Sequence, residues 1–161
     1  MAKLSDIIGY LCENYPYVDE LSKARLAKMI YLGDWKSALE EGHQISKIRW
    51  VFNHYGPYVD DVINVANADK SFKVIVEQNA YGDLKERIEL FEKRDWSSLS
   101  EKDKEWLDHV IDQTKCLYWK DFIKLVYSTF PVLVSEKLTQ LDLERLAERY
   151  KSEMRSRAVA V

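Results

Sequence analysis

A chain of 161 residues, 47% of them hydrophobic, is long enough for one domain that buries about 70% of its unfolded surface. Its net charge of −3 excludes the strongly basic character typical of nucleic-acid-binding proteins, so we expect no direct DNA binding. No apolar run approaches the roughly 20 residues that span a bilayer, and charged residues interrupt the first segment, so we predict a cytoplasmic protein without a membrane partner.

The first part of the chain predicts two helices. Apolar residues recur at helical spacing over residues 4–15 and again over 22–41, where they cover much of the circumference. Ser22 suits the N-cap of the second helix, and Gly42 suits the left-handed position that follows a helix end. We therefore predict a short helix followed by a long, mostly buried one.

A change of spacing after residue 42 predicts a strand. Hydrophobic residues alternate over residues 48–53, which is typical of a half-buried strand, and Tyr55, Gly56 and Pro57 end it. Because proline is well suited to the first turn of a helix, we expect Pro57 to begin a helix with an apolar face over 59–66.

Two further alternating segments, 72–76 and 88–90, flank turn residues at 81–83 and predict a β-hairpin. An isolated hairpin is marginally stable in water. We therefore expect this hairpin to pair with residues 48–53 and form a sheet of three strands.

The remaining residues predict three helices. Ser100 fits the N-cap of the first, and Pro131 is expected to end the second. The last helix is predicted over about 140–155, with Thr139 as its N-cap.

These elements predict a mainly helical α+β fold, with about six helices around a small two- or three-stranded antiparallel sheet. We expect residues 1–155 to form a single domain, because the sequence contains no repeat and no linker-like stretch. Residues 156–161 are expected to fray at the C-terminus.

The residue types found in active sites are present without the spacing that catalysis or metal binding needs. His43, His54 and His109 have no second histidine or cysteine at metal-ligand spacing. Cys12 and Cys116 lie in no nucleophile motif, and the five glycines form no phosphate-binding loop. The sequence therefore predicts a protein that is not an enzyme and that uses no metal and no cofactor.

Two motifs carry a resemblance to a known family. The string LSKARLAKMIYLGDW begins at Leu21 and is followed by an aromatic segment that ends in FNHYGPY at Tyr58, and YSTFP begins at Tyr127. In this order and spacing they resemble the Panacea domain of SocA-like antitoxins, a family once described as phage-associated. The resemblance covers about residues 5–150. The matching residues of the first motif are Leu21, Lys23, Leu26, Lys28, Met29, Ile30, Tyr31, Trp35, Phe52, Tyr55, Gly56, Pro57 and Tyr58.

The resemblance implies an antitoxin of a toxin–antitoxin system, which neutralises a cognate protein toxin encoded by a neighbouring gene through direct protein–protein binding. The family pairs with unrelated toxins, so the resemblance does not identify this one. Two alternatives stay open. One is a proteolytic adaptor that delivers a bound protein to an AAA+ protease, and the other is a small enzyme with an unrecognised site.

The corner where the predicted strand meets the next helix is the predicted partner-binding surface. Tyrosine, tryptophan and arginine are the residue types that anchor protein interfaces. The candidates for binding the partner are Arg49, His54, Tyr55 and Tyr58, with Lys28 and Lys36 of the long helix as further candidates.

Overall fold

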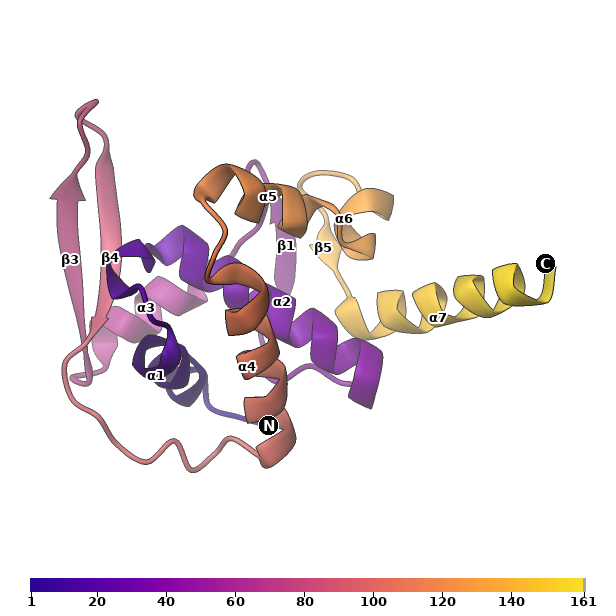
Figure 1. The fold of residues 1–161 in the computed structure, drawn as a ribbon, viewed down its shortest axis with the longest axis horizontal. Coiled ribbons are helices and arrows are strands. Elements are labelled where there is room, and N and C mark those ends of the chain that lie inside the picture. The colour runs from indigo at the N-terminus through magenta and orange to yellow at the C-terminus, as the bar shows by residue number, and fades with distance from the viewer. Residues whose placement is uncertain (161) are drawn as a thin grey trace.

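The computed structural model describes residues 1–160 and contains seven α-helices, one short 3₁₀ helix and five β-strands within them (Figure 1). The mainly helical α+β prediction is therefore confirmed. The elements are α1 (Leu4–Asn14), the 3₁₀ helix η1 (Val18–Glu20), α2 (Lys23–Glu41), β1 (Trp50–Asn53), β2 (Gly56–Pro57), α3 (Asp61–Ala68), β3 (Phe72–Gln78), β4 (Leu84–Leu90), α4 (Glu101–Thr114), α5 (Trp119–Tyr127), α6 (Phe130–Val134), β5 (Gln140–Leu141) and α7 (Leu143–Ala160).

Helix α2 forms the centre of the fold. It packs against α1, α3, α4 and α7, and 13 of its 19 residues are buried. Ser22 caps its start, where the hydroxyl oxygen accepts a hydrogen bond from the backbone N–H of Arg25 at 3.1 Å. Gly42 follows its end with a φ of 81°, in the left-handed region that glycine adopts without strain. Both predicted ends of the long buried helix are confirmed.

The strands form two separate antiparallel sheets. β1 is the middle strand of a small sheet in the order β2–β1–β5, while β3 and β4 form a hairpin of their own. The predicted hairpin is confirmed, but its expected pairing with residues 48–53 is wrong. β5 takes that place by pairing Leu141 with Trp50. The hairpin packs instead against α1 and α3. This packing buries Phe72 and Ile88 of its apolar face, while Val76 and Leu84, nearer the tip, stay exposed.

Both proline predictions are wrong. Pro57 lies in β2, opposite Phe52 of β1, and α3 begins only at Asp61. β2 is an edge strand, where the missing N–H of proline does not break a ladder. Pro131 does not end α5. It lies in the first turn of the separate helix α6, a position that proline also favours.

The C-terminal helix begins later and extends further than the sequence predicts. Thr139 is not its cap, because residues 140–141 form β5, and Asp142 accepts a hydrogen bond from the backbone N–H of Arg145 at 3.2 Å. α7 then continues through Ala160, and Val161 lies outside the described residues. Fraying of residues 156–161 stays a prediction. Figure 1 shows the later turns of α7 leaving the body of the molecule.

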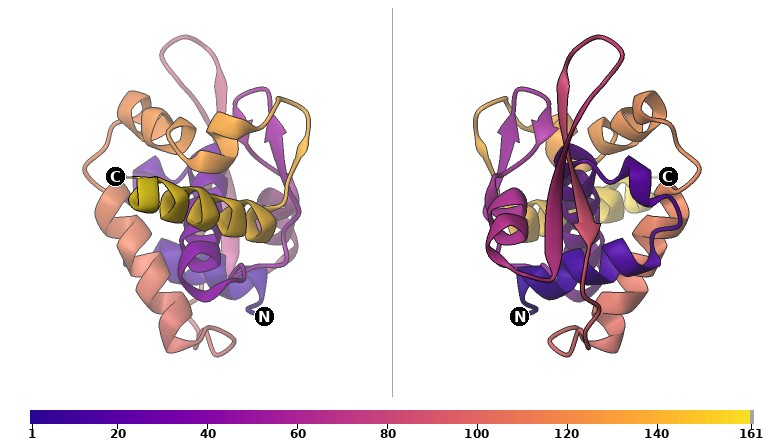
Figure 2. Two further views of the ribbon diagram at one scale, coloured as in Figure 1. Left: turned by 90° about the vertical axis from the view of Figure 1, so that its right-hand side faces the viewer. Right: turned by 90° about the vertical axis from the view of Figure 1, so that its left-hand side faces the viewer.

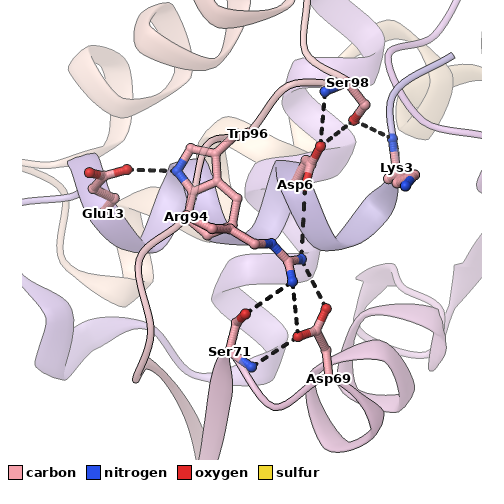
Figure 3. Close-up of polar contacts among 8 residues, drawn as sticks. All are labelled: Lys3, Asp6, Glu13, Asp69, Ser71, Arg94, Trp96 and Ser98. Carbon is pink, nitrogen blue, oxygen red and sulfur yellow. Dashed lines mark hydrogen bonds and ion pairs between the residues drawn. The ribbon is translucent and has the colours of Figure 1, made fainter.

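A polar network attaches the long connection between β4 and α4 to the helices beside it (Figure 3). Arg94 donates to the carboxylate of Asp69 at 2.9 Å and lies 3.8 Å from that of Asp6. Asp6 also accepts from the backbone N–H of Ser98 at 3.0 Å. A cleft of about 810 Å³ lies beside Arg94, but these charges are paired within the chain, which favours a structural role. Across the described residues, no helix combines the length and apolar character needed to cross a membrane.

Candidate partner-binding surface

Exposed hydrophobic side chains gather at one end of the molecule. The hairpin tip, the β1–β2 turn, α5 and the α6–β5 connection all lie along its upper edge in Figure 1, and Figure 2 shows them there from both sides. We call this end the apical surface. Its exposed apolar residues are Tyr55, Tyr81, Leu84, Tyr118, Trp119 and Leu138. A surface that exposes several large apolar side chains is typical of one that binds another macromolecule.

The β1–β2 turn presents two of the predicted partner-binding residues. His54 and Tyr55 are exposed in the turn, and Tyr55 is 83% exposed. Gly56 follows with a φ of 100°, which side chains rarely tolerate, and a Cβ there would come within 3.1 Å of the Tyr127 ring. The glycine therefore lets the chain reverse closely over α5 while the ring of Tyr55 remains in solvent.

Beneath this turn, Lys28 of α2 supports Tyr58. Lys28 is only 2% exposed, and its Nζ lies 5.6 Å from the centroid of the half-buried Tyr58 ring. Desolvation lowers the pKa of Lys28 to about 8. Burial, together with the charge of Asp60, raises the pKa of Tyr58 to about 12. Lys28 acts on the surface through Tyr58, because its own ammonium is almost covered.

The other two candidates lie away from the turn. Arg49 is exposed just before β1, at the opposite end of the strand from the turn, beside a cleft of about 300 Å³ that it shares with residues 140–142. Lys36 pairs with Glu40 at 2.9 Å and lies 5.5 Å from the Trp106 ring of α4. The structure thus brings together Lys28 and the three residues of the corner, and separates Arg49 and Lys36 from them.

A buried carboxylate positions β1, and with it the corner. Asp34 of α2 is fully buried and accepts hydrogen bonds from Trp50 Nε1 at 2.8 Å and from the backbone N–H of Ser46 at 2.9 Å. Desolvation outweighs these hydrogen bonds and raises the pKa of Asp34 to about 6. Asp34 therefore attaches both the connection before β1 and the first residue of that strand to the central helix.

Sequence reasoning missed a groove beside the corner. It has a volume of about 560 Å³ and runs between β4 and the first turns of α2 and α5. Leu84, Tyr118 and Trp119 form an exposed apolar rim, while Arg25, 3% exposed, lines the groove below them. The sequence carries one signal of this site. Two cationic residues, Lys23 and Arg25, occupy the first turn of α2, where the helix dipole favours acidic residues.

Arg25 also fixes the segment that carries the aromatic rim. Its Nη2 donates to the backbone carbonyl oxygens of Thr114 and Leu117, both at 2.9 Å, at the C-terminal end of α4. A cation is favourable at that end of a helix. These bonds hold the connection from α4 to α5 against α2 and so set the position of Tyr118.

A comparison with protein-family models matches residues 26–130 to the SocA-like antitoxin family, Panacea domain. The chain belongs to this family. No curated protein and no solved structure matches it. In this Panacea domain the two sequence motifs meet behind the corner. The hydroxyl of Tyr31 lies 2.8 Å from that of Thr129, and the Phe52 and Tyr127 rings pack edge to face at 6.2 Å. The motif residues therefore build the support of the β1–β2 turn.

Among residues 1–160, no group of three or more histidine, cysteine, aspartate and glutamate side chains is arranged to hold a metal ion. The polar side chains that converge most closely, around Asp34 and Arg94, make their contacts within the chain. The apical surface, by contrast, exposes its side chains to solvent, where another molecule can contact them.

Proposed function

We propose that this Panacea domain is an antitoxin that neutralises a protein toxin by direct contact through its apical surface. The observation that carries the proposal is the exposure of aromatic and aliphatic side chains from four separate segments at one end of the molecule. The motif residues of the family support one of those segments, the β1–β2 turn. Membership of an antitoxin family supports the same function.

The chemistry of this surface suits protein recognition. An aromatic side chain buries about 150–250 Å² when a partner covers it, and it loses little side-chain entropy because it has only two rotatable bonds. Tyr55, Tyr118 and Trp119 are therefore the proposed anchors, while His54 adds a polar group beside them. Tyr58, supported from below by Lys28, forms the inner side of the same corner.

The toxin is proposed to be the product of the neighbouring gene, and growth tests this directly. The adjacent reading frame is expressed alone and then together with this chain. We expect growth arrest in the first case and rescue in the second, accompanied by a complex that survives size-exclusion chromatography. A harmless neighbour, or equal killing in both cases, would refute the antitoxin function.

A second candidate function is a proteolytic adaptor that delivers its bound partner to an AAA+ protease. The observation that favours it is the projection of α7 away from the body, which leaves an elongated end for another protein to engage (Figure 1). Deleting residues 156–161 tests this role. Unchanged neutralisation together with an unchanged half-life of the partner would remove the adaptor function.

A further inference from the structure

We propose that the groove between β4, α2 and α5 binds a short acidic segment of the protein partner, with a carboxylate against Arg25 and a neighbouring apolar side chain on the aromatic rim. This inference rests on the proposed antitoxin function and assigns it a second contact site beside the β1–β2 corner. The groove volume of about 560 Å³ lies within the range of about 300–1,000 Å³ that is usual for sites that enclose a ligand.

The charges at the start of α2 favour an anionic group. The first turn of this helix contains no acidic residue, so nothing within it offsets the positive end of the helix dipole. Lys23 and Arg25 add two further positive charges there. A carboxylate that enters the groove would meet both side chains and the dipole together, which is a favourable combination for an anion.

Arg25 has an unused hydrogen-bond donor. Its Nη2 is occupied by two carbonyl oxygens, but its Nε is buried and donates to no acceptor among residues 1–160. Nearly all buried polar groups in proteins have a partner, so an orphan donor calls for an explanation. This Nε is covered by the chain itself, where the guanidinium lies 4.5 Å from the centroid of the Phe122 ring. A carboxylate from the partner would instead pair with the positive charge of the guanidinium, which α4 already holds in place at the groove.

The acidic residues of the groove are already engaged. Glu86 pairs with Lys23 at 3.3 Å, and Glu20 accepts a hydrogen bond from the Tyr15 hydroxyl at 2.8 Å, while its carboxylate lies 3.8 Å from Arg25. Lys85, which also lines the groove, donates to the backbone carbonyl of Asp19 at 3.1 Å. The lining nevertheless holds three cationic side chains against two carboxylates, so the complementary ligand is an acceptor with negative charge.

The rim determines what accompanies the carboxylate. Leu84 is 74% exposed and Tyr118 is 81% exposed, and they face the groove from β4 and from the start of α5. Covering both would bury apolar surface at about 25 cal/mol per Å². A free small anion would leave the rim in water. A peptide segment that carries an aspartate or glutamate beside an apolar residue uses both parts of the site.

Binding measurements with the neighbour-encoded protein test the groove separately from the antitoxin function. Two variants change it: Lys23→Glu reverses a charge, and Tyr118→Ala removes an exposed ring. We expect each to weaken binding by at least about tenfold at an unchanged melting temperature, because central aromatic and charged contacts dominate interfaces. Lys102→Glu on α4 is the matched control, since Lys102 also pairs with a glutamate on the surface, at 3.1 Å, and should not affect binding.

Peptides that tile the partner sequence identify the carboxylate. We expect one peptide to bind the wild-type domain, and to lose binding when its aspartate or glutamate is replaced by asparagine or glutamine. Equal binding of the amide peptide would overturn recognition of a carboxylate. Full affinity in both groove variants, or an equal loss in Lys102→Glu, would overturn the groove while the antitoxin function stands. Absence of binding by the intact domain would overturn both.

Discussion

The ammonium of Lys28 lies 5.6 Å from the centroid of the Tyr58 ring, and it forms no hydrogen bond or ion pair within residues 1–160. Burying a charge without a carboxylate partner is unfavourable for folding, and the contact with the ring offsets only part of that loss. We therefore expect Lys28 to lower stability while it positions the corner proposed to bind the toxin.

Replacing Lys28 by methionine should stabilise the protein. Methionine fills a similar volume without a charge to desolvate, and we expect a gain of about 1–3 kcal/mol in the free energy of unfolding at pH 7. Urea denaturation of the two proteins measures this difference. A loss of stability would show that the buried ammonium is stabilised by its surroundings.

The pH dependence of that difference identifies its cause. The pKa of Lys28 falls from 10.5 to about 8 on folding. Between these values the folded protein has lost a proton that the unfolded chain still holds, so the stability of the wild type rises with pH. The advantage of Lys28→Met should therefore be complete below pH 8 and should shrink as the pH approaches 10.5. A difference that is constant over this range would assign the gain to packing.

Asp34→Asn should destabilise the protein. The two carboxylate oxygens accept from different donors, Oδ2 from Trp50 Nε1 and Oδ1 from the backbone N–H of Ser46. In either orientation, the NH₂ group of an asparagine would face one of these two donors. An amide nitrogen has no free lone pair and cannot accept a hydrogen bond, so that donor would lose its partner. We expect a loss of about 1–3 kcal/mol at pH 7, measured by urea denaturation with Trp fluorescence.

The same pair of proteins reports the titration of Asp34. Its pKa rises from 3.8 to about 6 on folding, so between these values the folded state keeps a proton that the unfolded chain has released. The stability of the wild type therefore falls as the pH rises through this range, and asparagine lacks this contribution. The wild type should exceed Asp34→Asn by more at pH 4 than at pH 7. An equal difference at both values would place the pKa of Asp34 near its ordinary value.

Tyr55→Ala should weaken neutralisation without loss of stability. The side chain is 83% exposed, so its removal leaves no cavity, and the melting temperature should stay within about 1 °C of the wild type. Arg49→Glu is the control, because Arg49 lies at the other end of β1. Rescue of growth should fall for Tyr55→Ala and persist for Arg49→Glu. The reverse result would place the contact with the toxin beside β5 instead of at the apical surface.

The parts of the fold that local chemistry determines could be predicted. Ser22 and Gly42 mark the ends of α2 because capping depends on a few neighbouring residues. Ser100 caps α4 for the same reason. The Pro57 prediction failed because proline suits both an edge strand and a first helical turn, and only tertiary pairing decides between them. The Pro131 prediction failed because proline can begin a helix as well as end one, and α5 had already ended at Tyr127.

The parts that depend on distant contacts could not be predicted. β5 has two residues, too few to show alternation, and its pairing with β1 joins segments about 90 residues apart. Prediction of the candidate site was limited in the same way, because its geometry also depends on contacts between distant segments. Tyr55 and Tyr58 were identified from residue type and motif, but the burial of Lys28 and the separation of Arg49 follow from packing. The groove joins Leu84 to Tyr118, which no local pattern connects.

Gly9→Ala should destabilise the protein, although alanine favours a helix. In an exposed helix this change gains about 1 kcal/mol. A Cβ on Gly9, however, would overlap the ring of Trp96, which packs across α1 and donates to Glu13 at 2.6 Å. Displacing that ring should cost about 1–3 kcal/mol beyond the gain. Gly33→Ala is the control, since its Cβ would lie 3.1 Å from a flexible Leu107 methyl group, and urea denaturation should show a smaller loss. A stabilised Gly9→Ala protein would mean that the connection between β4 and α4 does not pack on α1 in solution.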